Sequence, residues 1–312
     1  MIVTVTLNAA LDVTYDVDEV VPHRSHRVTA VRERAGGKGV NVASVLARMG
    51  HEVVATGYAG GRTGADLCAD LDVRGIAHQF VDGGEARRTV TVVSAAHGDA
   101  TVFNERGPVV PADAWASMVD RLGDLVRDRG AGVVVISGSL PRGLPSDACW
   151  QLVRVAHAHG ARAVVDVEGV ALREAVTAAP EVVKPNRHEL LSATGCTDVA
   201  TGVALLRSTG ARDVVVSDGA DGVLVFPLHG RPLRAWLPAP LAGNPTGAGD
   251  ALVAALASGL EAGDPWPVVA RRAVAWSAAA VLQPVAGEVD PDDATDLESQ
   301  VRMEETDDAV PA

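Results

Sequence analysis

Lysine is almost missing from this chain of 312 residues. Lys38 and Lys184 are its only two lysines, and arginine supplies the rest of the 27 basic side chains. The 40 acidic side chains outnumber them and give a formal net charge of −13. Such a chain lacks the basic surface that binds the backbone of nucleic acids or the headgroups of anionic membranes. We therefore expect no nucleic acid and no membrane among its partners.

Cysteines and long apolar runs are also scarce. Cys68, Cys149 and Cys196 are odd in number and far apart, which is typical of reduced thiols rather than of a disulfide framework. No run approaches the roughly 18 consecutive apolar residues of a membrane-spanning helix. The N-terminal residues lack a basic segment and favour a first strand over a signal peptide. These absences indicate a cytoplasmic protein.

Short apolar runs alternate with longer amphipathic segments along most of the chain. The composition is that of a folded globular protein, and the length fits one large α/β domain or two small ones. Several apolar runs lack polar alternation, as do parallel strands buried on both faces. We expect these strands at Ile2–Leu7, Val53–Gly57, Gly132–Ser137, Arg162–Asp166, Val182–Lys184 and Asp213–Ser217. We expect helices at about 39–49, 62–74, 111–128, 146–159, 198–209, 247–262 and 266–282. The pattern predicts an α/β fold, with a mostly parallel central sheet flanked by helices on both faces.

Two inserted segments alternate apolar and polar residues in a two-residue period instead. They span about residues 12–34 and 87–105, and they predict either a small β-sheet lid or simple surface hairpins. From about Asp290 onward the chain becomes acidic and loses its apolar periodicity. We expect one domain over residues 1–290 and a disordered acidic tail over residues 296–312.

The sharpest motif is Asn244-Pro-Thr-Gly-Ala-Gly-Asp250, directly before an alanine-rich helical segment. A glycine-rich turn at a helix N-terminus directs backbone N–H groups and the positive end of the helix dipole at one point, which makes an anion site. An aspartate is unusual at such a site, because its negative charge repels an anion. Its presence makes sense if the side chain has a chemical task. Asp250 is therefore either a base that accepts a hydroxyl proton or a plain helix N-cap.

Polar residues at two other places also predict ligand contacts. Arg34-Ala-Gly-Gly-Lys-Gly-Val-Asn-Val-Ala43 opens a helix, with glycines that permit close approach of a ligand; the alternative is a loop with a solvated lysine. Asp12 closely follows the first strand, at the sheet edge where open α/β sheets bind ligands. Asp12 could accept hydrogen bonds from two sugar hydroxyls, or it could cap a turn.

Lys184-Pro-Asn-Arg-His-Glu-Leu190 follows a strand and starts a short helix. Asn186 and Glu189 are three positions apart, so both can face one point. Their oxygens suit Mg²⁺ bound through water on a nucleotide, and the same pair also fits a helix capping box. Two further turns at strand ends are weaker signals: Ser137-Gly-Ser-Leu-Pro-Arg-Gly143 and Ser217-Asp-Gly-Ala-Asp-Gly222.

Together these motifs resemble the ribokinase-like carbohydrate kinases, also called the PfkB family. That family carries an N-terminal Gly-Gly-Lys or Gly-Gly-Asn element and a C-terminal Gly-Ala-Gly-Asp anion hole, and both are present here in that order. Within the family the chain is most similar to the branch of 1-phosphofructokinase and tagatose-6-phosphate kinase. The resemblance covers residues 1–290 and implies a ribokinase-like fold with a lid.

The resemblance implies an ATP- and Mg²⁺-dependent sugar-phosphate kinase. Asp250 corresponds to the general base, and the amides of Gly247, Ala248 and Gly249 correspond to the anion hole. The residues expected at the sugar phosphate are Asp12, Gly37, Lys38, Asn41, Arg87 or the adjacent Arg88, Ser139 and Arg27. The residues expected at the nucleotide are Lys184, Asn186, Ser217, Gly219, Gly222 and Thr246, with Asn186 and Glu189 organising Mg²⁺ through water.

The motifs leave the sugar phosphate open. Our leading hypothesis is fructose 1-phosphate, converted to fructose 1,6-bisphosphate, and the alternatives are tagatose 6-phosphate and fructose 6-phosphate. The Asn-Pro-Thr before Gly-Ala-Gly-Asp resembles tagatose-6-phosphate kinases, whereas Val102-Phe-Asn-Glu-Arg-Gly-Pro108 resembles 1-phosphofructokinases. A lid lysine of the minor 6-phosphofructokinase is absent near Ser25, where Arg27 is a candidate substitute.

Other functions fit less well. A kinase of a non-phosphorylated sugar or cyclitol would leave Lys38 and Arg87 without an anionic partner. An inactive sugar-phosphate-binding regulator would not need Asp250, Asn186 and Glu189. A dinucleotide-dependent oxidoreductase would carry Gly-x-Gly-x-x-Gly after the first strand, which is absent. Family members often dimerise through lid strands, so we also expect a homodimer.

Overall fold

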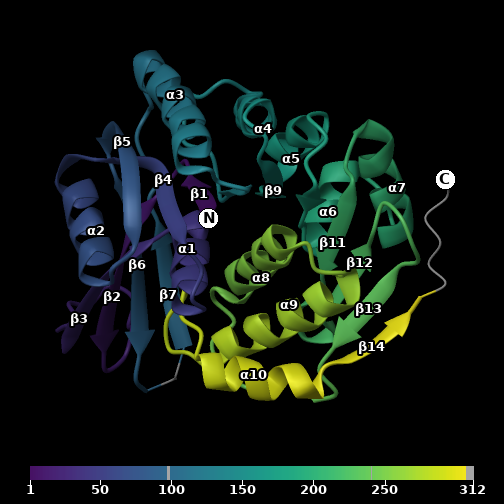
Figure 1. Ribbon diagram of the computed structural model, residues 1–312. Coiled ribbons are helices and arrows are strands. Elements are labelled where there is room, and N and C mark those ends of the chain that lie inside the picture. Colours follow the sequence, from purple (N-terminus) through teal and green to yellow (C-terminus); the bar gives the residue numbers. More distant parts are fainter. Residues whose placement is uncertain (97–98, 240, 307–312) are drawn as a thin grey trace.

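A ten-stranded sheet runs through the computed structural model of the protein, which describes residues 1–96, 99–239 and 241–306 (Figure 1). Strands from β11 to β5 along the sheet are parallel, and the last three at the other edge are antiparallel. In spatial order the strands are β14 (Arg302–Glu305), β13 (Leu233–Trp236), β12 (Val223–Phe226), β11 (Asp213–Ser217), β10 (Val182–Val183), β9 (Arg162–Asp166), β8 (Val133–Ser137), β1 (Ile2–Thr6), β4 (Val53–Gly60) and β5 (Ala77–Glu85).

Helices cover both faces of this sheet, as its strands of continuous apolar residues require. Every residue of β1 and of β8 is buried, so neither face of these strands meets solvent. One face carries α1 (Lys38–Arg48), α2 (Gly61–Val73), α8 (Ala248–Ala262), α9 (Trp266–Val281) and α10 (Pro291–Gln300). The other carries α3 (Ala112–Arg129), α4 (Ala148–Ala158), α5 (Gly169–Val176), α6 (Arg187–Thr194) and α7 (Val199–Thr209). The predicted α/β architecture is confirmed.

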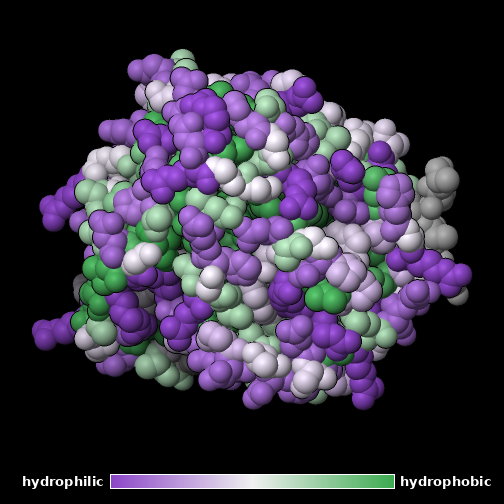
Figure 2. All heavy atoms as spheres, in the orientation of Figure 1, coloured by the Kyte–Doolittle hydropathy of each residue, from purple (hydrophilic) through white to green (hydrophobic). Residues whose placement is uncertain are grey.

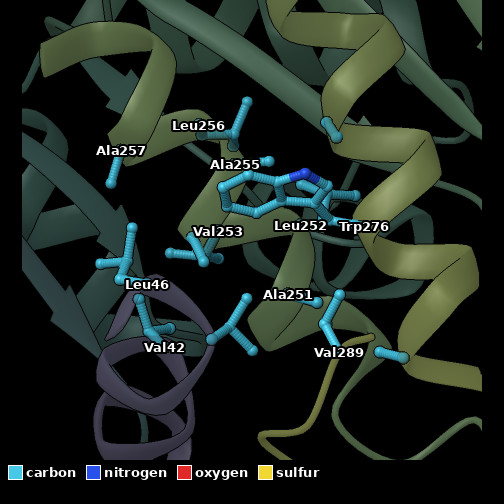
Figure 3. Close-up of a cluster of buried hydrophobic side chains, with 14 of the residues drawn as sticks. Val42, Leu46, Ala251, Leu252, Val253, Ala255, Leu256, Ala257, Trp276 and Val289 are labelled. Carbon is cyan, nitrogen blue, oxygen red and sulfur yellow. The ribbon is translucent and has the colours of Figure 1, made fainter. Parts of the chain in front are cut away.

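Helix α8 is buried between its neighbours because its side chains are small and apolar. All residues from Asp250 to Gly259 are buried, which is typical of a helix that is apolar all round. In Figure 3 the Trp276 ring of α9 lies across α8, while Val42 and Leu46 reach the same helix from α1. The packing fixes the N-termini of α1 and α8 relative to each other, and these two ends carry predicted site residues.

The two inserted segments form one small sheet, so the prediction of a lid is confirmed and the alternative of separate hairpins is wrong. The strand order is β3 (Ala30–Gly36), β2 (Ala10–Val17), β6 (Arg87–Ser94) and β7 (Asp99–Asn104). Strands β2 and β6 pair in parallel, whereas the two outer pairs are antiparallel. The lid joins segments that are far apart along the chain and lies beside β4, β5 and α2 (Figure 1).

The C-terminal segment is more ordered than its composition suggested. We expected disorder from residue 296, but α10 continues to Gln300 and β14 pairs with β13. Asp290 caps α10 by accepting from the backbone N–H groups of Asp292 and Asp293, and Ala294 and Leu297 bury the inner face of the helix. The acidic residues thus lie at the N-terminus of α10 and on its solvent-exposed face. The rest of the predicted tail, residues 307–312, lies outside the described residues.

The molecular surface is mostly hydrophilic on the face that Figure 2 shows, with hydrophobic residues gathered at its left edge, over α2 and the lid. Val31, Val102 and Phe103 of the lid are each more than half exposed. Among the helices of the described ranges, none is long and apolar enough to cross a membrane.

Candidate active site

A cleft of about 1250 Å³ lies between the lid and the carboxyl ends of the parallel strands. This is the edge at which open α/β sheets bind ligands. Most of the residues that the sequence singled out line it: Asp12, Gly37, Lys38, Asn41, Arg87, Lys184, Asn186, Glu189, Ser217, Gly219, Gly222, Thr246, Gly247, Ala248, Gly249 and Asp250. The fold therefore gathers both glycine motifs, one lid face and three strand ends around one space.

Asp250 lies in the first turn of α8 with only 7% of its surface exposed. The N-cap position belongs to Gly247, whose φ of 88° is in the left-handed region that favours glycine, so the alternative that Asp250 is an N-cap is wrong. Asn41 Nδ2 donates a hydrogen bond to Asp250 Oδ2 at 2.8 Å. Burial and the negative charge of Asp166 raise the pKa of Asp250 to about 7, although Asn41, Lys38 and Lys184 act in the opposite direction.

The amides that precede Asp250 are not equivalent. Ala248 N–H donates to the Pro245 carbonyl at 3.2 Å, which engages one of the three predicted anion-hole donors. Within the described part of the chain, the N–H groups of Gly247 and Gly249 make no hydrogen bond. Both residues line the cleft, so these two amides are the donors that an anion would meet first.

The N-terminus of α1 faces the same space. Gly37 has a φ of 101°, and a Cβ there would come within 3.0 Å of the Thr6 side chain and 3.3 Å of the Ala9 Cα. The next residue, Lys38, has 41% of its side chain exposed and its Nζ lies 3.7 Å from Asp166 Oδ2. Burial alone would lower the pKa of Lys38, but Asp166, Glu189 and Asp250 raise it overall. Lys38 is therefore a charged cleft residue rather than a solvated loop lysine.

Asp166 is a cleft residue that our sequence reasoning missed. It ends β9 and lies in the cleft wall with 2% of its surface exposed. Lys184 Nζ is 3.0 Å from its Oδ1, and Ser137 Oγ donates to its Oδ2 at 2.8 Å. The available signal was its place as the last residue of a predicted strand, at the ligand edge of the sheet.

The lid contributes Asp12, Thr89 and Arg87. Asp12 on β2 is opposite Thr89 on β6, and its carboxylate fits against Gly36, where a Cβ would come within 2.0 Å of Oδ2. Burial raises the pKa of Asp12 to about 6, and Thr89, Arg87 and Arg34 limit that rise.

The structure also distinguishes Arg87 from its neighbour. Arg87 lines the cleft and is held by the Asn8 carbonyl at 3.1 Å and by Thr89 Oγ1 at 3.2 Å. Arg88, one position on, lines a second, smaller pocket with Glu33 and Asp66, because successive strand residues point to opposite faces.

Asn186 and Glu189 form the capping box that the sequence offered as an alternative to a metal site. Glu189 N–H donates to Asn186 Oδ1, and Asn186 N–H donates to Glu189 Oε2, both at 2.8 Å. The box leaves Glu189 Oε1 uncommitted, and both residues line the cleft. No group of three or more His, Cys, Asp or Glu side chains is arranged as a metal site in the described ranges. These donors fit an ion that takes most of its ligands from water and nucleotide phosphates, as Mg²⁺ does.

The far end of the cleft combines glycine turns with an apolar wall. Ser217, Gly219 and Gly222 line it from the end of β11 and the turn that follows, and Thr246 lines it from the loop before α8. Gly222 has no room for a Cβ, which would come within 2.1 Å of the Ala235 carbonyl. The wall consists of Leu237, Leu241, Val274, Ala278 and Val281. Such a slot suits a flat, largely apolar ring.

Two predicted residues do not reach the cleft. Arg27 is exposed in the connection between β2 and β3, at the far end of the lid. Asp12 is five residues from the end of β2, so this connection lies about 17 Å from it along the strand. Ser139 is also exposed, and it accepts a hydrogen bond from Asn8 Nδ2 at 3.1 Å outside the cleft wall.

Comparison with known proteins identifies the family. A family model described as pfkB family carbohydrate kinase matches residues 5–293. A 1-phosphofructokinase of Xanthomonas campestris pv. campestris is 40% identical over 270 residues, which are 83% of each chain. The structure of phosphofructokinase-2 from Escherichia coli in complex with fructose-6-phosphate is 29% identical, with a TM-score of 0.86 over 96% of this chain and 98% of its own. A possible 1-phosphofructokinase from Thermotoga maritima is 25% identical, with a TM-score of 0.85 over 98% and 99%. The chain therefore belongs to the pfkB family of carbohydrate kinases and is an ATP-dependent sugar kinase.

Proposed function

We propose that the protein transfers the γ-phosphoryl group of ATP to O6 of fructose 1-phosphate and forms fructose 1,6-bisphosphate. One observation carries the proposal: a single cleft holds a buried carboxylate, unpaired amides at a helix N-terminus and two cationic side chains. Asp250 supplies the carboxylate, and Lys38 and Arg87 supply the cations. A sugar phosphate needs all three kinds of group, because it brings a hydroxyl to deprotonate and a phosphate to bind.

The reaction forms one bond and breaks one. The substrate hydroxyl oxygen bonds to the γ-phosphorus while the bond from that phosphorus to the bridging oxygen of ADP breaks, and the hydroxyl proton passes to Asp250. A base whose pKa is about 7 is well matched to this transfer at neutral pH. The amides of Gly247 and Gly249, at the positive end of α8, would stabilise the charge on the equatorial phosphoryl oxygens.

Mg²⁺ on the nucleotide would be held through water by Asn186 and Glu189. Such an ion neutralises charge on the ATP phosphates and orients them. The capping box between Asn186 and Glu189 fixes both side chains at the start of α6. The single side-chain oxygen of Asn186 already accepts from Glu189 N–H, so Glu189 Oε1 is the oxygen that the box leaves over. The apolar wall, to which α9 contributes Val274, Ala278 and Val281, and the glycine turn after β11 would take the adenine ring at the other end of the cleft.

Fructose 1-phosphate is preferred over the other hexose phosphates for two reasons. The relative of 40% identity is a 1-phosphofructokinase, whereas the phosphofructokinase-2 structure bound to fructose-6-phosphate is 29% identical. Arg27, the candidate substitute for a lid lysine on a 6-phosphate, lies outside the cleft. Tagatose 6-phosphate and fructose 6-phosphate are the alternative substrates. A non-phosphorylated sugar would leave Lys38 and Arg87 without the anion that they suit.

We further propose that the protein is a cytoplasmic homodimer joined through the lids. Strands β3 and β7 are the two open edges of the lid sheet, and Val31, Val102 and Phe103 are exposed on them. Open edges with exposed apolar side chains favour pairing with a second copy. Sedimentation should give a dimer that Phe103→Glu dissociates; a monomeric unmodified chain at assay concentration would overturn this proposal.

Initial rates of ADP release test the function. The assay compares fructose 1-phosphate, fructose 6-phosphate, tagatose 6-phosphate and fructose, each with MgATP. We expect kcat/KM for fructose 1-phosphate to exceed that for each 6-phosphate at least about tenfold, and that for fructose by more. A higher kcat/KM for either 6-phosphate would make that sugar phosphate the substrate and leave the proposed mechanism unchanged. If fructose were turned over and none of the three sugar phosphates were, the sugar-phosphate assignment would be wrong. If no sugar led to ADP release, an inactive regulator would be supported.

A further inference from the structure

Asp166 lies in the wall of the cleft, and the proposed reaction gives it no task. Its Oδ1 lies 3.0 Å from Lys184 Nζ, and its Oδ2 lies 3.7 Å from Lys38 Nζ. These are the only two lysines in the chain, and both share this one carboxylate. Lys38 begins α1, whereas Lys184 directly follows β10, so Asp166 connects the sugar-phosphate side of the cleft with the nucleotide side.

The surroundings of Asp166 keep it ionised. Burial alone would raise its pKa, but Lys184 and Lys38, together with the hydrogen bond from Ser137, lower the pKa overall. A buried carboxylate with such partners is a fixed negative charge at neutral pH. A structural ion pair would need one buried lysine, and Lys184 already fills that role because its side chain is 5% exposed. Lys38, by contrast, is anchored with its side chain 41% exposed to the cleft.

The same charge acts on Asp250. The groups that face Asp250 are the carboxylate of Asp166, the ammonium groups of Lys38 and Lys184, and the side-chain amide of Asn41. Asp166 raises the pKa of Asp250, and the other three lower it. Without Asp166, two uncompensated cations would face the base and hold it ionised, which makes it a poorer proton acceptor.

We propose that Asp166 is a positioning residue that anchors both lysines in the wall of the cleft and balances their charge beside Asp250. The inference rests on the proposed function, in which Asp250 is the base and Lys38 faces the sugar phosphate. Asp166 touches neither substrate in this account and acts through the side chains around it. Lys184 thereby gains a role as well, since it keeps the shared carboxylate ionised.

The pH dependence of kcat/KM for the sugar phosphate tests the proposal. In Asp166→Asn the acidic limb of the profile should move to lower pH by about one unit, because a charge that raises the pKa of Asp250 is removed. KM for the sugar phosphate should rise about tenfold, since Lys38 loses its anchor. The substrate phosphate, which titrates near pH 6, affects all variants alike, so differences between variants report on the enzyme.

Two further variants make the test independent of the folding of Asp166→Asn. Lys38→Met removes a cation at a part-exposed position, and the acidic limb should then move to higher pH. Asp166→Glu keeps the charge and moves its position, so KM should rise while the limb stays in place. A limb that does not move in folded Asp166→Asn or in Lys38→Met would overturn the proposal, because a merely structural role lowers activity equally at every pH. Asp250→Asn distinguishes failure of the proposed function from failure of this inference. If Asp250→Asn retains turnover, Asp250 is not the base. If it loses turnover while the acidic limbs of Asp166→Asn and Lys38→Met stay in place, only the role of Asp166 fails.

Discussion

The side-chain amide of Asn41 donates a hydrogen bond of 2.8 Å to the carboxylate of Asp250, across 209 residues of sequence. It joins the first turn of α1 to the first turn of α8, which are the two glycine-rich helix starts in the cleft. Both side chains are buried, so water competes little with the bond. The two motifs thus meet in one contact inside the cleft.

Replacing Asn41 with Ala should move the acidic limb of kcat/KM to higher pH. The base must be ionised to act, and Asn41 stabilises the ionised form, so its loss raises the pKa of Asp250. A hydrogen bond to a charged group contributes about 1.5–3 kcal/mol, which corresponds to a shift of about one pH unit or more. Activity at pH 6 should therefore fall more than activity at pH 8.5.

Ser44→Ala is the matched control for Asn41→Ala. Ser44 lies one turn further along α1, is buried, and donates a hydrogen bond to the Val40 carbonyl. Its loss should leave the limb in place. A shift of equal size in both variants would mean that α1 has moved and that the bond to Asp250 is not the cause.

Arg87→Gln and Arg88→Gln should affect KM for the sugar phosphate differently, because the two arginines lie on opposite faces of the lid. Arg87 faces the cleft and Arg88 pairs with Glu105 outside it. We expect KM for the sugar phosphate to rise at least about tenfold in Arg87→Gln, because a charge-assisted contact to phosphate is lost. Arg88→Gln should change KM less than about twofold, since exposed ion pairs contribute little. Steady-state kinetics that show equal effects would contradict this assignment.

Lys38→Arg should not behave as a conservative change. The ammonium of Lys38 lies beside Asp166 next to a glycine at positive φ, and a guanidinium is planar, larger and needs a different approach. KM for the sugar phosphate should rise more than KM for ATP. Equal increases in the two constants would indicate a general disturbance of the cleft.

The sequence predicted regular elements best where local pattern determines them. Arg162–Asp166 and Asp213–Ser217 are strands with the expected boundaries, because buried parallel strands are continuous apolar runs. The antiparallel strands β12, β13 and β14 were missed. Each has four residues, and β14 exists through its pairing with β13 rather than through its own sequence of Arg302-Met-Glu-Glu305.

The candidate site shows the same division. Glycine motifs at helix starts are local, so Gly37 and Gly247 could be identified from sequence. Asp166 is the last residue of a predicted strand, but its contacts could not be predicted, because its partners come from β8, the end of β10 and α1, which are brought together only by the fold. Arg27 was misplaced because its position depends on how far the lid hairpin extends, which spacing along the chain does not determine.

The capping box at α6 predicts that stability and metal use can be separated. Asn186→Ala removes both the cap and a side-chain oxygen in the wall of the cleft, and should cost about 1 kcal/mol of unfolding free energy. Asn186→Asp keeps the cap and should preserve stability in urea unfolding, while the Mg²⁺ concentration for half-maximal rate changes. If both variants showed unchanged Mg²⁺ dependence, Asn186 would be a cap alone.

Turnover of Asp250→Asn is the most direct test of the account. Asparagine keeps the size of the side chain in the first turn of α8 and removes its ability to take a proton. With saturating MgATP and fructose 1-phosphate, the account predicts a fall in kcat of at least about a hundredfold, the usual range for loss of a general base, with the dissociation constant of ATP nearly unchanged. A variant that keeps near-normal kcat would contradict the account.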